Sequence, residues 1–282
     1  MSTSQAEKAK RFQALHERPG AFVIPNPWDA GTARILAGLG FEALTTTSAG
    51  LAFALGRRDG DGSVTREDAL ANARAIVDAT EVPVAADLEN GYGHAPDAAA
   101  ETIRLAAAVG LVGASIEDAT GDHGNPIYDF EHSVERVAAA AEAARALPFP
   151  FMFVARAENF LHGRPDLDDT IRRLQAFEKA GADVLYAPGL TKAEEIRAVC
   201  AALRKPVNVV MGLKSGSLSV ADLSALGVKR ISVGSSLARA ALSGFFDAAR
   251  EIRERGTFTF AEDILSFAAV SEMVGRAATE DR

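Results

Sequence analysis

The chain has 282 residues, 48% of them hydrophobic, and a formal net charge of −8 at pH 7. This length and composition can bury the core of one large α/β domain or of two small ones. Because no stripe of lysine and arginine accompanies the acidic balance, a nucleic-acid partner is excluded. The single cysteine, Cys200, excludes an internal disulfide, and its apolar surroundings favour an inert thiol packed in the core.

The first 20 residues are polar and amphipathic, with an expected helix at residues 5–17 and without the apolar centre of a secretory signal. Nowhere do about 18 apolar residues follow one another, which is the length that a membrane-spanning helix needs. We therefore expect a cytoplasmic protein with no membrane partner.

Short apolar runs alternate with stretches of helical spacing along most of the chain. Eight runs predict strands, at residues 21–25, 42–47, 82–87, 111–117, 151–156, 183–187, 207–211 and 230–233. The runs are continuous, which is typical of parallel strands buried on both faces. Eight such units predict an α/β fold, a (β/α)8 TIM barrel at residues 1–255. No G-x-G-x-x-G follows the first strand, so an open dinucleotide-binding sheet is disfavoured.

In such a barrel the carboxyl ends of all strands meet at one mouth. Polar or small residues occupy or follow these ends, and we expect them to line one cavity: Asp29, Ser48, Asp87, Glu117, Arg156, Tyr186, Asn208 and Gly234.

Acidic residues end two consecutive strands of the predicted barrel. The run PVAADLENGYG, residues 83–93, breaks from an apolar strand into Asp87 and Glu89, and the next strand ends at Glu117. A lone aspartate before a glycine more often caps a turn, but two acidic strand ends favour a bound cation. Together with Asp59, in a preceding loop rich in glycine and aspartate, these carboxylates predict a site for Mg²⁺, with Mn²⁺ as the alternative ion.

The fifth predicted strand ends in Arg156, whose guanidinium suits a carboxylate or a developing oxyanion. A salt bridge to Glu117 or Glu158 is the alternative role, and the two roles are compatible. Hydroxyl and backbone N–H groups in a tight turn predict a second carboxylate site, at Thr47, Ser48, Ala49 and Gly50.

The histidines carry weaker signals. His123, in the loop after the fourth strand, is a candidate proton carrier, although a loop histidine is more often a bystander. His16 and His132 fall on predicted helices, where we expect them to face solvent.

A cation beside an arginine suits a small oxo-acid. The cation holds the carboxylate and oxo oxygens, and the positive groups stabilise an enolate as a bond next to the carbonyl breaks. Retro-aldol cleavage, decarboxylation and phosphoryl migration all pass through such an enolate.

Four motifs jointly resemble those of the isocitrate lyase and phosphoenolpyruvate mutase superfamily, in its order and nearly its spacing: LGRRD at 55–59, DLENGYG at 87–93, SIED at 115–118 and VARAE at 154–158. The resemblance implies a barrel in which Asp87 holds Mg²⁺ while Asp59, Glu89 and Glu117 act largely through water. It also implies that residues 48–50 bind a substrate carboxylate and that Arg156 contacts the reacting oxo-acid.

The sequence also departs from the superfamily pattern. Residues 118–125 lack the lysine and cysteine of the isocitrate and methylisocitrate lyase loop, and Ala187-Pro188-Gly189 stands where those lyases carry a glutamate. The histidine of the phosphonate enzymes is also missing near Tyr186. These departures favour the branch that acts on oxaloacetate or another small 2-oxo dicarboxylate. In that reading Asn208 and His123 are candidates to orient the leaving end, and no general acid is assigned.

Three functions stay open at this point. The leading one is an Mg²⁺-dependent lyase or decarboxylase that breaks a carbon–carbon bond of a 2-oxo or 2-hydroxy acid. The alternatives are a phosphonate mutase or hydrolase and a non-catalytic protein that binds a 2-oxo acid, which the missing loop cysteine favours.

Residues 256–282 form an additional helical segment with apolar residues on one broad face. Eight units already close the barrel, so this face needs another surface. We expect it to dock on a neighbouring subunit, and packing on its own barrel is the alternative. The resemblance implies a homotetramer in which paired subunits exchange their last helices.

Overall fold

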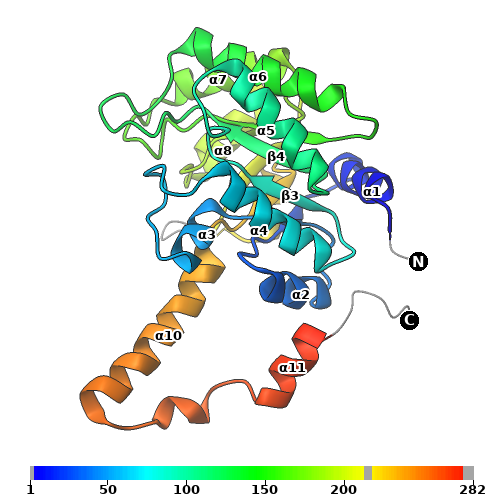
Figure 1. Ribbon diagram of the computed structural model, residues 1–282. Helices are drawn as coiled ribbons and strands as arrows, with labels where there is room; N and C mark the ends of the chain where they lie inside the picture. The colour runs from blue at the N-terminus through cyan, green and yellow to red at the C-terminus, as the bar shows by residue number, and fades with distance from the viewer. Residues whose placement is uncertain (1–2, 213–217, 276–282) are drawn as a thin grey trace.

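The computed structural model describes residues 3–212 and 218–275. Within these residues eight short parallel strands form a nearly closed barrel, which confirms the predicted α/β TIM-barrel fold (Figure 1). The strands are β1 (Phe22–Ile24), β2 (Leu44–Thr45), β3 (Val84–Asp87), β4 (Gly113–Glu117), β5 (Met152–Arg156), β6 (Val184–Tyr186), β7 (Val207–Val210) and β8 (Arg230–Ser232). Each lies within its predicted run, which was up to two residues too long at either end.

The barrel closes between β1 and β2. Each strand pairs with its neighbour in the order β1-β8-β7-β6-β5-β4-β3-β2, and the ladder leaves β1 and β2 as its two edges. The Thr45 N–H donates to the Pro25 carbonyl (3.1 Å), and the Asn26 side chain donates to the Thr46 carbonyl (2.8 Å). These two bonds bridge the seam immediately below the mouth.

Helices surround the barrel, and several begin at residues that cap them. Ser4, Thr65 and Ser219 each accept a bond from the backbone of the third helical residue. Asp29 caps α2 in the same way and lines neither cavity at the mouth, so the prediction that it lies there was wrong. The helices are α1 (Gln5–Glu17), α2 (Ala30–Gly38), α3 (Ser48–Ala54), α4 (Arg66–Asp78), α5 (Pro96–Ala108), α6 (Phe130–Arg145), α7 (Leu167–Ala180), α8 (Ala193–Ala202), α9 (Val220–Ala225), α10 (Ser236–Arg255) and α11 (Phe267–Gly275).

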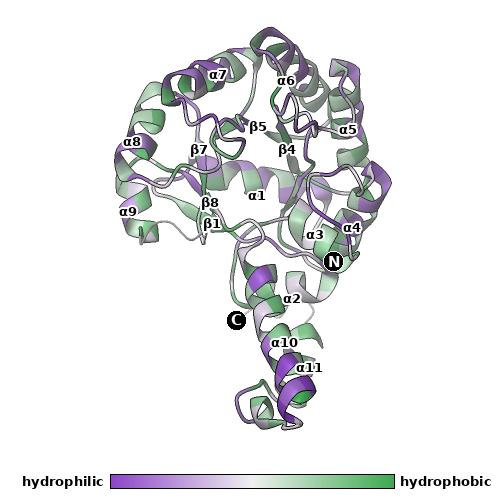
Figure 2. Cartoon of the chain, turned by 90° about the vertical axis from the view of Figure 1, so that its left-hand side faces the viewer, coloured by the Kyte–Doolittle hydropathy of each residue, from purple (hydrophilic) through white to green (hydrophobic). Residues whose placement is uncertain are grey.

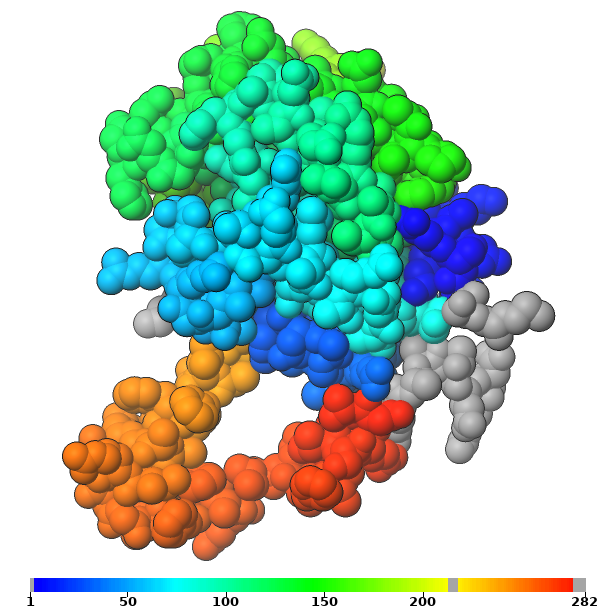
Figure 3. Space-filling view, in the orientation of Figure 1, coloured from blue at the N-terminus to red at the C-terminus, as the bar shows by residue number. Residues whose placement is uncertain are grey.

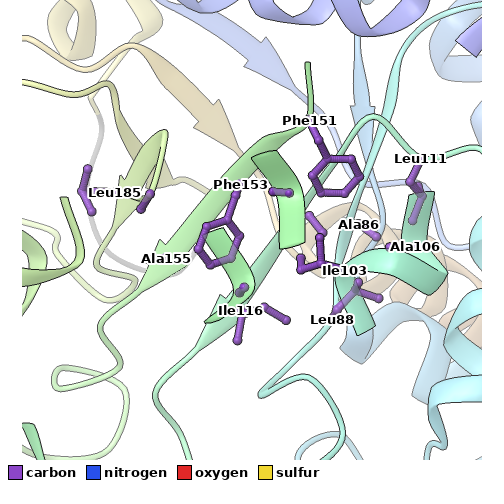
Figure 4. Close-up of a cluster of buried hydrophobic side chains, with 14 of the residues drawn as sticks. Ala86, Leu88, Ile103, Ala106, Leu111, Ile116, Phe151, Phe153, Ala155 and Leu185 are labelled. Carbon is purple, nitrogen blue, oxygen red and sulfur yellow. The ribbon is translucent and has the colours of Figure 1, made fainter. Parts of the chain in front are cut away.

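Two apolar clusters fill the molecule. The larger one lies between strands and outer helices, where Phe153 and Ile116 pack near Ile103 of α5 (Figure 4). The smaller one lies inside the barrel, where Phe12 of α1 packs with Phe22. Figure 2 looks along the barrel and shows α1 behind the strands. The helix therefore covers the end of the barrel opposite the mouth.

The segment after β8 leaves the barrel. Helix α10 extends away from it, a short 3₁₀ turn (Thr259–Glu262) follows, and α11 returns toward α2. The Arg34 guanidinium donates to the Val274 carbonyl (3.0 Å), so the end of α11 contacts its own barrel. Figure 3 shows an open space between this arch and the barrel. Residues 276–282 of the predicted extension lie outside the described residues.

Large apolar side chains remain exposed on this arch. They include Phe245 and Phe246 of α10 and Phe267 of α11, the last of them 90% exposed. Across the two described stretches, no helix has both the length and the apolar character to span a bilayer.

His16 is buried, contrary to the prediction that it faces solvent. Its ring lies edge-on to Phe12 and Phe22, and its Nδ1 contacts the Phe12 carbonyl (2.8 Å). Burial and the positive charges of Arg230 and Lys229 lower its pKa to about 3. The prediction failed because the face of α1 that carries His16 packs against the strands, where the ring meets Phe22 of β1.

This burial predicts a pH-dependent loss of stability. The unfolded histidine has a pKa of about 6.5, so the folded state resists protonation that the unfolded state accepts. The contribution of the neutral ring is complete above pH 6.5 and is lost as the pH falls toward 3, at up to about 1.4 kcal/mol per pH unit. Urea unfolding of the wild type and of His16→Gln at pH 7.5 and 5.5 measures it. The wild type should lose about 1 kcal/mol more than the variant, and equal losses would contradict the prediction.

Candidate active site

Two connected cavities open at the carboxyl ends of the strands. The wider one has a volume of about 840 Å³, and the narrower one, of about 190 Å³, reaches between the strands into the barrel. Ser48, Asp59 and Arg156 line both. The strand ends therefore form a common mouth, as parallel strands in a barrel require.

Arg156 joins three carboxylates at this mouth. Its guanidinium contacts the carboxylates of Asp87 (Nη1–Oδ1, 2.8 Å), Glu117 (Nη2–Oε2, 3.1 Å) and Glu158 (Nε–Oε1, 2.8 Å). Strand register explains the meeting, because Glu117 pairs with Arg156, and alternation turns both side chains inward. The salt bridges expected at Glu117 and Glu158 are present, with a third to Asp87.

The Tyr186 ring packs against the guanidinium of Arg156. Its ring centroid is 5.1 Å from Arg156 Cζ, and the two residues are registered partners on β5 and β6. Burial raises the pKa of the Tyr186 phenol, so the phenol stays protonated and can donate a hydrogen bond.

Ser48 holds the second oxygen of Asp87. Its backbone N–H (3.3 Å) and its hydroxyl (3.1 Å) both donate to Asp87 Oδ2. Residues 48–50 were expected to form a tight turn, but they are the first turn of α3, which Thr47 caps by accepting from the Gly50 N–H (3.2 Å). Gly50 is needed here, since a Cβ atom would lie 2.9 Å from the Trp28 Cβ.

The loop that carries Glu89 has an unusual backbone. Glu89 (φ 46°) and Tyr92 (φ 57°) adopt left-handed conformations that non-glycine residues rarely take. Arg136 of α6 is buried and donates to the carbonyls of Asn90, Gly93 and His94. These bonds hold the loop, so Arg136 is a positioning residue that sequence reasoning missed.

A second buried arginine supports Glu158. Asp118 accepts from the Glu158 backbone N–H (2.8 Å) and pairs with Arg173 of α7 (Nη1–Oδ2, 3.1 Å). Burial raises the pKa of Asp118 to about 7, although Arg173 acts in the opposite direction. In the sequence, Asp118 stood out only as the last residue of the SIED motif, and Arg173 carried no local signal.

The mouth holds more carboxylates than the single guanidinium of Arg156 can neutralise. Burial, with the negative charges of Asp87 and Asp59, raises the pKa of Glu89 to about 7. The pKa of Glu117 rises well above its ordinary value, chiefly through burial, and burial likewise raises that of Asp59. An added cation would relieve this crowding, so the donor set fits a hard divalent ion.

Most bonds of such an ion would have to come from water or substrate. In the parts of the chain that the structure describes, no three or more His, Cys, Asp or Glu side chains are arranged to bind a metal together. Asp87 fits a direct ligand, because its negative charge acts on the carboxyls of Asp59, Glu89 and Glu117 alike. Asp59, Glu89 and Glu117 fit a shell of bound waters, which Mg²⁺ commonly retains.

The other predicted residues divide between the two cavities. His123 lines the wider cavity from an exposed loop, whereas Thr47, Ala49 and Asn208 line the narrower one. Asn208 donates to the Ser232 hydroxyl (3.0 Å). Asp29 lines neither cavity, whereas Asn26, two residues after the end of β1, lines the narrower one.

Sequence comparison assigns the chain to a known family. A model of the family described as phosphoenolpyruvate phosphomutase matches residues 12–253. The chain belongs to this phosphoenolpyruvate mutase family. Its structural neighbours belong to the wider phosphoenolpyruvate mutase/isocitrate lyase superfamily.

Relatives within the superfamily share most of the chain. A crystal structure of a lyase/mutase of unproven activity from Burkholderia cenocepacia J2315 is 59% identical, with a TM-score of 0.94, and covers 98% of each chain. The 2,3-dimethylmalate lyase of Eubacterium barkeri is 30% identical, over 78% of this chain and 77% of its own length. An oxaloacetate decarboxylase of Bradyrhizobium diazoefficiens is 27% identical, over 98% and 95%. The family member described here is an enzyme of the carbon–carbon lyase type.

Replacing Arg156 tests the charge balance of the mouth. Arg156→Met leaves buried carboxylates without their cation, which should cost about 3–5 kcal/mol of the free energy of unfolding at pH 7.5. Protonation relieves the repulsion, so the loss should shrink at pH 5.5. Urea unfolding without divalent ions measures both. Arg172→Met, at an exposed salt bridge to Asp169, is the control and should change little. The same loss at both pH values would refute this charge balance.

Proposed function

We propose that this family member is an Mg²⁺-dependent lyase or decarboxylase acting on a small 2-oxo or 2-hydroxy carboxylic acid. The observation that supports it is Arg156, held at the mouth by Asp87, Glu117 and Glu158 and therefore fixed in direction. A guanidinium fixed in this way is preorganised for charge that develops on a reacting oxo group. The lyase and decarboxylase relatives favour the same chemistry.

In this proposal the side chains of the mouth divide the work. Mg²⁺, held directly by Asp87 and through water by Asp59, Glu89 and Glu117, would supply Lewis acidity toward the carboxylate and oxo oxygens. Arg156 donates to the oxygen that becomes negative when the bond next to the carbonyl breaks. The Tyr186 ring packs against this guanidinium through a cation–π contact. At the start of α3 the Thr47 hydroxyl and the Ala49 N–H would donate to a substrate carboxylate, and Ser48 and Gly50 shape this turn through their bonds to Asp87 and Thr47.

Proton transfer has nearby candidates. The Glu89 carboxylate lines the wider cavity beside the acidic set and is the first candidate. His123 lines the same wide cavity and stays the second candidate. Asn208, deeper in the barrel, would orient the leaving end of the substrate.

Asp87 gives the direct test of this function. Asp87→Asn removes the charge between Ser48 and Arg156, and kcat/KM for oxaloacetate with Mg²⁺ should fall by about 10²-fold to 10³-fold. EDTA should abolish turnover of the wild type, and Mg²⁺ should restore it. Asp168→Asn, on an exposed turn of α7, is the matched control and should keep full activity.

A panel of 2-oxo and 2-hydroxy acids, assayed for pyruvate or another carbon–carbon cleavage product, covers the substrate class. Turnover of phosphonopyruvate alone would point instead to phosphonate chemistry. Activity that persists in EDTA would reject the role of the divalent ion.

We further propose that a second copy of the chain covers the arch formed by α10 and α11. The arch exposes Phe245, Phe246 and Phe267, and it encloses an open space beside the barrel (Figure 3). A monomer seldom exposes so many large apolar groups together. Two such arches can interlock around a two-fold axis, and pairing of two exchanged dimers would give a homotetramer.

Removing the apolar groups of α10 should break this assembly. A Phe245→Ser/Phe246→Ser double variant, and a chain ending at Gly256, should both elute as smaller species in size exclusion with light scattering. Val220→Ser, at a half-exposed apolar site on α9, is the control. An unchanged mass for both altered chains would reject the exchange.

A further inference from the structure

Arg230 is a buried cation that pairs with no anionic side chain in the described part of the chain. It begins β8, is 4% exposed and lines the narrower cavity. Its Nε and Nη1 atoms are buried and have no hydrogen-bond partner. Within the described residues no carboxylate forms an ion pair with it. The Phe12 ring lies 5.8 Å from Cζ, and Tyr186 is close enough to raise the pKa of Arg230 slightly against the effect of burial.

Leaving such a charge unpaired is costly. An isolated ion in a protein interior loses its hydration, and one aromatic ring replaces little of it. Burial lowers the pKa of Arg230 only to about 10, so the guanidinium is still positive at neutral pH. An anion entering the narrower cavity would supply the missing partner.

Strand register connects Arg230 with the mouth. Arg156, Tyr186, Asn208 and Arg230 are successive registered partners on β5, β6, β7 and β8. Registered residues face the same side of a sheet, and the tilt of barrel strands makes such a row descend into the barrel. A row of inward side chains therefore runs from one guanidinium to the other.

Asn208 in this row is also incomplete. Its Nδ2 donates to Ser232, but its Oδ1 is buried and accepts from no donor of residues 3–212 and 218–275. The inner cavity thus offers a free cation and a free acceptor beside each other in register. Together they suit a carboxylate accompanied by a hydroxyl group or a bound water.

We propose that Arg230 binds the second carboxylate of a dicarboxylic acid whose reacting end lies at Arg156. This inference rests on the proposed function and narrows its substrate class to dicarboxylates. Asn208 Oδ1 accepts a hydrogen bond from the hydroxyl or water next to that carboxylate. A monocarboxylate of the same length leaves Arg230 unpaired and binds more weakly.

Two stable ligands of matched length test this subsite. Malate and 2-hydroxybutyrate have the same four-carbon chain and differ in one carboxylate. Calorimetry with Mg²⁺ should give the wild type a Kd for malate about tenfold or more lower than that for 2-hydroxybutyrate, as expected for a charge-assisted pair. Arg230→Met should raise the Kd for malate to that for 2-hydroxybutyrate and leave the Kd for 2-hydroxybutyrate unchanged. Arg172→Met should keep the full preference.

The melting temperature separates this role from a structural one. Arg230→Met removes an unpaired buried charge, so the ligand-free Tm should stay equal or rise. If this variant does not fold, Arg230→Gln replaces it in the same titrations. Malate preference retained in the folded variant would overturn the proposal. A second result would also overturn it: inorganic phosphate raises the Tm of the wild type but not of Arg230→Met, and the wild type binds malate no more tightly than 2-hydroxybutyrate. Arg230 would then bind a free anion and not a substrate carboxylate.

The readout is independent of turnover. Loss of the malate preference in Arg230→Met supports the subsite even if no substrate of the panel is cleaved, an outcome that would reject only the proposed reaction. Cleavage of a dicarboxylate with the preference unaffected by Arg230→Met would reject only the subsite.

Discussion

The mouth of this barrel depends on one guanidinium that bonds three carboxylates. Asp87 and Glu117 end neighbouring strands, and Glu158 lies just beyond the strand that carries Arg156. Without a cation these groups would repel one another in a poorly hydrated space. The same ion pairs that hold the strand ends together also fix the direction of the arginine. Structural integrity and readiness for chemistry therefore have a common origin here.

Groups outside the mouth maintain that arrangement. Arg136 bonds the carbonyls of the loop after β3, and Arg173 pairs with the carboxylate that supports Glu158. Each arginine comes from a helix on the outside of the barrel, so the outer layer restrains the inner one. Catalytic side chains on strands, supported by buried partners on helices, stay close to one geometry.

The sequence predicted the barrel and much of its mouth, because a strand places its last side chain without knowledge of distant contacts. Asp87, Glu117 and Arg156 could be assigned in this way. Asp29 could not, since the segment after β1 turns away and the aspartate caps α2. Arg136 and Arg230 escaped notice because an arginine in a helix or at a strand start is usually solvated, and only tertiary packing buries it. The prediction that His16 faces solvent failed for the same reason.

Helix α1 gives the barrel a closed floor. Phe12 and Ile24 are fully buried there, and Arg230, which lines the narrower cavity, lies over the Phe12 ring. Within the described residues, substrate and products then share one doorway. When a molecule is split in such a blind chamber, the fragment nearer the doorway departs before the fragment nearer the floor. In the proposed reaction, this geometry would make the fragment at Arg156 leave before the fragment at Arg230, and the inner fragment would then be the stronger product inhibitor.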